Sequence, residues 1–199
     1  MDNILNNPKT KRGEATMHKI IDAAKQTFYE KGYYHSTIND ITNRANVGSG
    51  TFYIYFDSKL TLYRYLLIDY CERIRTNSSD AIRACKSRRE AERVGIKSFF
   101  DFVLKEPEIF NIIWESLYID KSLFDNFYTT FADSYSAKLR AAQLTGEVRD
   151  IDPEIVSYSL IGITNFLALN TLVIKDRKDV DYLVDEVMKM LDGGIFTNK

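Results

Sequence analysis

The chain has few of the residues that most often carry catalysis or bind metal. It holds two cysteines and two histidines among 199 residues. Cys71 and Cys85 lack metal-ligand spacing and are too few for a disulfide framework, so we expect small, partly buried side chains, with redox sensing as the alternative. His18 and His35 stand outside any catalytic constellation, and the sequence has neither an HExxH motif nor a glycine-rich phosphate loop. The sequence therefore predicts a protein that is not an enzyme, with no catalytic residue, metal site or cofactor.

The sequence also lacks a signal peptide at its start and an apolar run of 18 residues. From these two features we expect a soluble, cytoplasmic protein with no membrane partner. Hydrophobic residues still make up 45% of the chain, which is enough to build a folded core. No segment alternates apolar and polar side chains over the length of a strand, so the predicted fold class is all-α.

Charge of one sign is not in large excess. The formal net charge is −1, which gives no overall case for binding nucleic acid. Residues 1–60 hold eight Lys and Arg against six Asp and Glu, whereas the rest of the chain holds nineteen against twenty-two. This weak asymmetry suits a DNA-reading domain followed by a different module.

Apolar residues at helical spacing predict helices along most of the chain. Gly32 is expected to end the first helix as an αL cap, and Asp152-Pro153 predicts the start of a helix. Pro107 is expected at a first helical position, and residues 1–12 are expected to form a loose arm. The predicted helices cover about residues 14–32, 37–45, 50–56, 58–84, 91–105, 108–118, 121–144, 153–173 and 180–191.

Residues 36–59 form the most informative pattern in the chain. Thr37, with Asp40 three residues later, is close to a capping box and starts a short helix. Asn46 and Gly48 then break the helical pattern, as a tight turn requires. The helix that follows is too short to be stable alone and presents one polar and aromatic face. Two short helices joined by such a turn are typical of a helix-turn-helix, which binds DNA.

Four stretches match one known family in kind, order and spacing. They are Ile20 to Ala24, Phe28 with Gly32, Thr37 to Ile41, and Val47 to Lys59 with Leu62 after it. On these residues the first third of the chain resembles the TetR/AcrR family of bacterial transcriptional regulators. The resemblance implies an all-α protein with a three-helix DNA-binding head that contains the helix-turn-helix, followed by a helical ligand-binding and dimerisation body. We expect the arm and DNA-binding domain over residues 1–57 and the body over residues 58–199.

The resemblance also implies which side chains touch double-stranded operator DNA. Thr37 is expected to contact a phosphate through its hydroxyl and a free backbone N–H, and Lys59 to pair with a phosphate. Asn39 stands where several relatives use arginine to read guanine, and asparagine suits adenine better. Tyr55 stands where many relatives carry histidine. The expected DNA-binding residues are Thr37, Asn39, Ser49, Gly50, Thr51, Tyr53, Tyr55 and Lys59.

Position alone adds to some of these expectations. Tyr53 comes one residue after Phe52, which is expected in the core, so its side chain is directed toward solvent or the DNA groove. For Ser58, capping of the next helix is the simpler interpretation. The basic residues of the arm are expected to add minor-groove contacts; these are Lys9, Lys11 and Arg12.

In this family the body binds a small inducer, and the aromatic content gives separate support for a cavity. Aromatic residues make up 13% of the chain, and many fall in three consecutive predicted helices. Ligand pockets are mostly apolar with a few polar anchors. The alternative, core packing with aromatic filler, is the simpler interpretation for each residue taken singly. The expected ligand-binding residues, for a small hydrophobic effector, are Phe102, Phe110, Trp114, Tyr128, Phe131 and Asn165.

The last two predicted helices are apolar on more than one side, so one side is expected to form a two-fold homodimer interface. The expected interface residues are Leu169, Leu172, Leu183, Val187 and Met190. We expect a repressor that an effector releases from its operator by favouring a dimer with wrongly spaced heads, with coupling through the long helix that Ser58 starts. The alternative is a DNA-binding adaptor or regulator without a small-molecule ligand.

Overall fold

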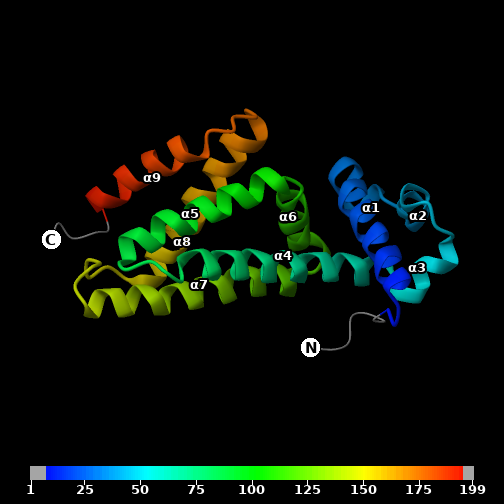
Figure 1. Cartoon of the computed structure of the whole chain (residues 1–199), viewed down its shortest axis with the longest axis horizontal. Helices are drawn as coiled ribbons and strands as arrows, with labels where there is room; N and C mark the ends of the chain where they lie inside the picture. The colour runs from blue at the N-terminus through cyan, green and yellow to red at the C-terminus, as the bar shows by residue number, and fades with distance from the viewer. Residues whose placement is uncertain (1–7, 195–199) are drawn as a thin grey trace. The chain divides into compact units, whose positions relative to one another are not determined.

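Helices make up the regular structure of the residues that the structure describes, 8–194 (Figure 1). The structure is a computed structural model of the whole chain. Those residues contain no strand, so the all-α prediction is confirmed. The elements are α1 (Lys11–His35), α2 (Ile38–Ala45), α3 (Ser49–Tyr55), α4 (Lys59–Ile82), α5 (Arg88–Lys105), α6 (Ile109–Ile119), α7 (Lys121–Leu144), α8 (Pro153–Ala168), the π-helix η1 (Leu169–Ile174) and α9 (Val180–Gly194).

The chain folds into two compact units that do not correspond to a single cut in the sequence. The first unit holds the described part of Met1–Cys71 together with Glu108–Asp125. The second holds Glu72–Pro107 together with the described part of Asn126–Lys199. Helix α6 therefore belongs with the N-terminal helices, and the chain changes unit inside α4, between α5 and α6, and again inside α7. The functional division expected after residue 57 stays a prediction.

The apolar stripe of α1 forms the centre of the first unit, as its spacing predicts. Ile20, Ala24 and Phe28 are fully buried, and so are Phe52 and Phe56 from α3 and its C-cap. Burying one phenylalanine side chain contributes roughly 1.5–3 kcal/mol. Helix α2 packs against both α1 and α3, so this core fixes which sides of the two short helices remain exposed.

The N-terminal end of α1 corrects the predicted arm. The Thr10 hydroxyl accepts the backbone N–H of Gly13 at 3.1 Å and caps a helix that begins at Lys11. Lys11 and Arg12 therefore lie in the first helical turn, and the prediction of a loose segment is wrong for both. Residues 1–7 of the predicted arm lie outside the described residues.

Two other helix ends also differ from the prediction. Gly32 has φ 72° and ψ 168°, so it breaks α1 with an extended ψ instead of acting as an αL cap, and helical structure resumes up to His35. Pro107 precedes Glu108, the N-cap residue of α6, so it does not occupy the first helical position. The predicted bounds of α7 agree with the structure.

Helix α5 is central to the second unit, where it packs against α8, η1 and α9. The side chains that α9 buries are Val180, Leu183, Val184, Val187, Met188 and Leu191. Leu172 of η1 is buried as well. The predicted dimer interface is therefore wrong for Leu172, Leu183 and Val187, because these side chains fill the core of their own subunit.

Three exposed ion pairs join α5 to α9. They are Arg89–Asp192, Arg93–Asp185 and Lys97–Asp181, each with an N–O distance of 2.6 Å. All the cations are on α5 and all the carboxylates on α9, and the order of the pairs makes the two helices antiparallel. An exposed pair of this kind contributes about 0–1 kcal/mol, so the buried apolar face supplies most of the attraction.

A buried ion pair lies in the first turns of α5. The side chains of Arg88 and Glu92 are 9% and 6% exposed and pair across one helical turn. The Tyr135 hydroxyl of α7 donates to the Glu92 carboxylate, and the Arg88 guanidinium lies 5.0 Å from the centre of the Tyr135 ring. The backbone N–H of Arg88 donates to the Glu147 carboxylate at 2.6 Å. Burial, followed by the nearby Glu92 charge, raises the pKa of Tyr135, so its hydroxyl remains a donor.

The α8 and η1 segment, Pro153–Ile174, is the most apolar long stretch of the described residues. By length and composition it is apolar enough to cross a membrane, which the sequence analysis did not anticipate. A core or interface helix of a water-soluble protein meets the same two criteria. Only 33% of its most apolar window is buried within the chain. Its exposed apolar side chains include Ile155, Tyr158 and Phe166.

Candidate nucleic-acid interface

The capping box that begins α2 is present as predicted. The Thr37 hydroxyl accepts the Asp40 N–H at 3.1 Å, and Asp40 accepts the Thr37 N–H at 2.9 Å. Lys31 also donates to Asp40 at 2.6 Å. The hydrogen bond from Lys31 first, then those that the Thr37 hydroxyl and N–H donate to the carboxylate, lower the pKa of Asp40 to about 2. The Thr37 N–H that the prediction assigned to a phosphate is therefore already bonded to Asp40.

The turn between α2 and α3 brings two predicted DNA-binding residues together. Asn46 adopts the αL conformation with φ 53° and ψ 50° and ends α2. Helix α3 then begins after Gly48 at Ser49, whose hydroxyl donates to Asn39 Oδ1 of α2 at 3.2 Å. Both side chains are exposed, so the two short helices share one polar surface that is fixed by this hydrogen bond.

The side chain of Tyr53 extends this surface along α3. It is 53% exposed, whereas its neighbour Phe52 is fully buried and meets the Tyr53 ring edge-on at 5.4 Å. Gly50 is exposed and Thr51 half-buried on the same helix. Ile54 is also exposed, and the sequence analysis did not single it out. We use the name reading surface for six exposed residues from the N-cap of α2, from α2 and from α3; they are Thr37, Asn39, Ser49, Gly50, Tyr53 and Ile54.

Tyr55 lies apart from the reading surface. Its side chain is only 6% exposed and belongs to the core of the first unit. Its hydroxyl lies near Gly13 of α1, 3.5 Å from the position that a Cβ on that glycine would take. The helical spacing of α3 explains this placement, because Phe52 and Tyr55 are three residues apart and so lie on the same buried side.

The Lys59 side chain forms hydrogen bonds to backbone carbonyls of the first unit. Its ammonium donates to the carbonyls of Tyr33 and Ser36 at 2.5 and 2.7 Å, and it lies 4.2 Å from the centre of the Tyr33 ring. Partial burial lowers the pKa of Lys59. Lys59 therefore satisfies carbonyls at the C-terminal end of α1, a role that sequence reasoning missed because the partners are more than twenty residues away. Ser58 accepts the Thr61 N–H at 3.1 Å, in agreement with its capping interpretation.

The predicted ligand-binding residues do not fall in one unit. Phe110 and Trp114, whose ring centres are 5.4 Å apart, lie on α6 in the first unit. Phe102, Tyr128, Phe131 and Asn165 lie in the second unit. The Asn165 amide donates to the Ile161 carbonyl of its own helix at 2.8 Å, and the Phe131 ring stacks on Tyr135 at 6.2 Å.

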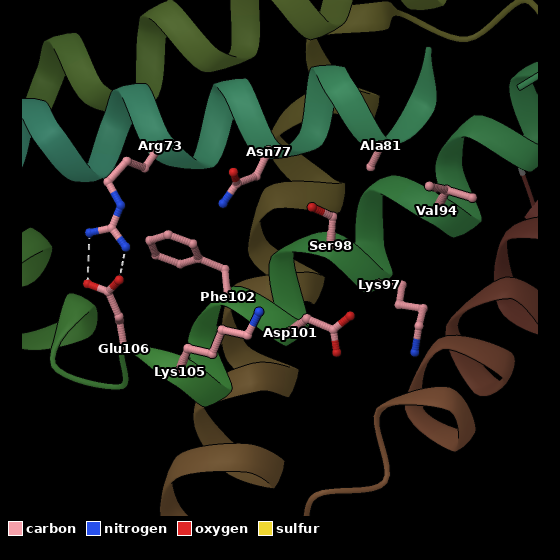
Figure 2. A pocket seen from close by; sticks show the side chains of 10 residues that line it. All are labelled: Arg73, Asn77, Ala81, Val94, Lys97, Ser98, Asp101, Phe102, Lys105 and Glu106. Carbon is pink, nitrogen blue, oxygen red and sulfur yellow. Dashed lines mark hydrogen bonds and ion pairs between the residues drawn. The ribbon is translucent and has the colours of Figure 1, made fainter. Parts of the chain in front are cut away.

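A groove between α4 and α5 in the second unit has a volume of about 580 Å³. Its lining residues are Arg73, Asn77, Ala81, Val94, Lys97, Ser98, Asp101, Phe102, Lys105 and Glu106 (Figure 2). Of the predicted ligand-binding residues, only Phe102 lines it. The ring of Phe102 lies beside the guanidinium of Arg73, 5.2 Å away, and Arg73 pairs with Glu106. Charged ends of α4 and α5 side chains surround this groove, so it differs from the apolar, aromatic pocket that the sequence predicts, and that pocket stays a prediction.

Comparison with known proteins agrees with this geometry. The family model described as bacterial regulatory proteins, tetR family, matches residues 20–66. The HTH-type transcriptional activator FasR of Mycolicibacterium smegmatis is 28% identical over 101 residues, which cover 51% of this chain and 46% of FasR. The match thus spans about half the length of that relative.

Solved structures share the fold. The fatty acid degradation regulator FadR of Bacillus halodurans superposes with a TM-score of 0.80 at 20% identity, covering 94% of this chain and 98% of that one. FadR of Bacillus subtilis, solved in complex with stearoyl-CoA, superposes with a TM-score of 0.75 at 18% identity, covering 88% and 97%.

Helical structure in the described residues, with a helix-turn-helix over a buried core, is the architecture of many DNA-binding transcription regulators. The match over residues 20–66 contains all of α2 and α3, and with them the reading surface. The matching residues 20–66 carry the DNA-binding domain of the TetR family of bacterial regulatory proteins, and the described residues share the all-helical fold of a solved TetR-family regulator.

Proposed function

We propose that this chain binds operator DNA as a homodimer through the reading surface and that a small effector in the second unit controls that binding. The observation that carries the proposal is the Asn39–Ser49–Tyr53 surface, which is polar, exposed and held by a buried core beneath it. Asparagine and serine read base edges, and tyrosine and serine bind phosphates. We keep Thr37, Thr51 and Lys59 as candidate phosphate contacts and leave the buried Tyr55 out.

The proposed dimer rests on the exposed apolar side of α8 and η1. Ile155, Tyr158, Phe166 and Ile174 are exposed there, although the same segment is long and apolar enough to cross a membrane. Exposed apolar surface of this extent is typical of an interface. A second copy related by a two-fold axis would bring two reading surfaces to one operator, with half-sites about 34–36 Å apart or a somewhat longer span.

Replacing Phe166, which is 66% exposed, with glutamate is expected to weaken the dimer at least ~10-fold. The physical reason is that the new carboxylate loses its water at the interface without gaining a partner. Analytical ultracentrifugation across a concentration series measures the change. Leu144→Glu, at an exposed leucine that ends α7, is the matched control and is expected to dissociate like the wild type. A Phe166→Glu chain with an unchanged dissociation constant would remove α8 from the interface.

The proposed effector has an apolar part and an anionic part. The groove between α4 and α5 is within the usual size range of ligand pockets, and it combines the Phe102 ring with three cations and the carboxylate of Asp101. Two of the cations also pair within the chain, Arg73 with Glu106 and Lys97 with Asp181, so an anionic group would share them with these carboxylates. The B. subtilis FadR neighbour carries stearoyl-CoA, a molecule with these two parts. This chemistry adds an anionic part to the small hydrophobic effector that the sequence suggests. A regulator without a small-molecule ligand remains the alternative.

Selection of duplexes from a randomised DNA pool by the wild-type chain tests the proposed function. A dimer is expected to select an inverted repeat, because the two-fold axis of the protein imposes the same symmetry on its site. Stearoyl-CoA is then titrated into the complex, with free coenzyme A as the control, and release is followed by fluorescence anisotropy. Selection of no common sequence would contradict operator binding, and release by neither compound would favour the ligand-free alternative.

A further inference from the structure

Two side chains from distant parts of the sequence hold the junction between α1 and α2, residues 32–36, within the first unit. The Glu115 carboxylate of α6 receives the backbone N–H of Tyr33 on both oxygens, at 2.9 and 3.2 Å. Lys59 of α4 donates to the carbonyls of Tyr33 and Ser36. The anionic Glu115 therefore binds one backbone N–H of the junction, and the cationic Lys59 binds two of its carbonyls.

Gly32 makes the approach of Glu115 possible. Its φ of +72° lies in the region that side chains rarely adopt, and a Cβ added there would lie 2.6 Å from Glu115 Oε1. The backbone conformation thus favours glycine at this position, and a larger residue would also make the end of the Glu115 side chain shift. The non-helical ψ of Gly32 turns the next peptide out of the α1 ladder, which leaves the Tyr33 N–H available to Glu115.

Helix α6 is itself fixed against the other helices of the first unit. The fully buried Tyr63 of α4 donates its hydroxyl to the Ile112 carbonyl. Tyr34 donates to the Tyr118 carbonyl at 3.0 Å. These bonds lie before and after Glu115 along α6, so its carboxylate has a defined place from which to hold the junction.

We propose that Glu115 is a positioning residue for operator recognition. The junction leads directly into Thr37 and the first turn of α2, so its position sets where Asn39 and, through the Asn39–Ser49 hydrogen bond, α3 are presented. Glu115 touches no residue of the reading surface among the contacts given above, and it acts through the backbone of Tyr33. This inference rests on the proposed function, because it assigns to that function a residue that makes no DNA contact.

A purely structural role predicts a different outcome from a positioning role. If Glu115 only stabilised the fold, its loss would lower the melting temperature, and the folded fraction would bind DNA as before. A displaced junction instead weakens base-edge contacts, which need accurate placement, more than phosphate contacts, which tolerate displacement. The ratio of affinities for a selected duplex and an unrelated duplex separates the two roles.

The experiment compares Glu115→Ala, Glu115→Gln and wild type on the duplex that the wild-type chain selects and on a duplex of unrelated sequence. Glu115→Ala is expected to lose at least ~10-fold in affinity for the selected duplex and less than ~3-fold for the unrelated one. Glu115→Gln keeps one oxygen to accept the Tyr33 N–H and is expected to recover most of the loss. Amide hydrogen exchange at Tyr33 is expected to be faster in Glu115→Ala and close to wild type in Glu115→Gln.

The matched control is Asp120→Asn, which removes a different carboxylate that ties the end of α6 to Arg64 at 2.6 Å. It is expected to keep the wild-type affinity ratio. Should Glu115→Ala not fold, Glu115→Gln and Glu115→Asp, compared by the same ratio and the same exchange measurement, decide the question. A folded Glu115 variant with faster exchange at Tyr33 and an unchanged ratio would overturn the positioning role alone. A wild-type chain that selects no duplex would overturn the proposed function and this inference with it.

Discussion

Replacing Tyr53 with alanine is expected to weaken binding to the selected duplex about 10- to 100-fold, which corresponds to roughly 1.4–2.8 kcal/mol. Tyr53 is the largest side chain of the reading surface, and half of it is exposed. It meets Phe52 only by a ring edge, so its loss leaves the core intact and the melting temperature close to that of wild type. Fluorescence anisotropy with a labelled duplex measures the affinity.

Two further variants separate the possible contributions of Tyr53. Tyr53→Phe removes only the hydroxyl, so a loss as large as that of Tyr53→Ala would identify a hydrogen bond to phosphate or base. Tyr29→Ala, at an exposed tyrosine of α1, is the control for a general effect of removing an aromatic side chain. Unchanged binding by a folded Tyr53→Ala chain would remove α3 from the proposed interface.

Replacing Arg88 with methionine is expected to destabilise the chain by about 3–5 kcal/mol. The substitution keeps a long apolar side chain and removes the cation, which leaves the Glu92 carboxylate buried with Tyr135 as its remaining partner. Stripping a carboxylate of its counterion in a buried place costs far more than losing a surface pair. Urea denaturation followed by circular dichroism measures the free energy of unfolding.

Comparison variants assign this loss to the unpaired charge. Arg88→Met combined with Glu92→Leu removes both charges and is expected to recover most of the stability. Arg83→Met breaks the exposed Arg83–Asp80 pair and is expected to change stability by less than about 0.5 kcal/mol. If Arg88→Met and Arg83→Met had equal effects, the Arg88–Glu92 pair would not have the importance that its burial implies.

Local sequence signals predicted the helices and the helix-turn-helix well. The capping box of Thr37 and Asp40 and the turn at Asn46 each involve only a few neighbouring residues, so the sequence alone can predict them. The same reasoning placed Tyr53 outward and Phe52 inward, as the structure has them. Such signals depend on the backbone near each residue and need no knowledge of distant packing.

Contacts between distant residues were not predictable in the same way. Lys59 looked like a surface cation, but two carbonyls at the end of α1 engage it. Glu115 carried no sequence signal at all, because its partner is a backbone N–H 82 residues away. For Leu183 and Val187, apolar character was correctly recognised, but the sequence did not reveal that α5 of the same chain covers them.

The ion pairs between α5 and α9 have a consequence for the alignment of those helices. The apolar side of α9 would tolerate sliding along α5 by one turn, because one aliphatic contact replaces another at similar cost. The ion pairs, in contrast, depend on the alignment of the two helices. A slip that brought Asp185 to Lys97 would carry Asp181 beyond the last cation of the row and leave Arg89 without a partner. Apolar burial thus holds α9 against α5, while the row of charges favours the observed alignment over the slipped one.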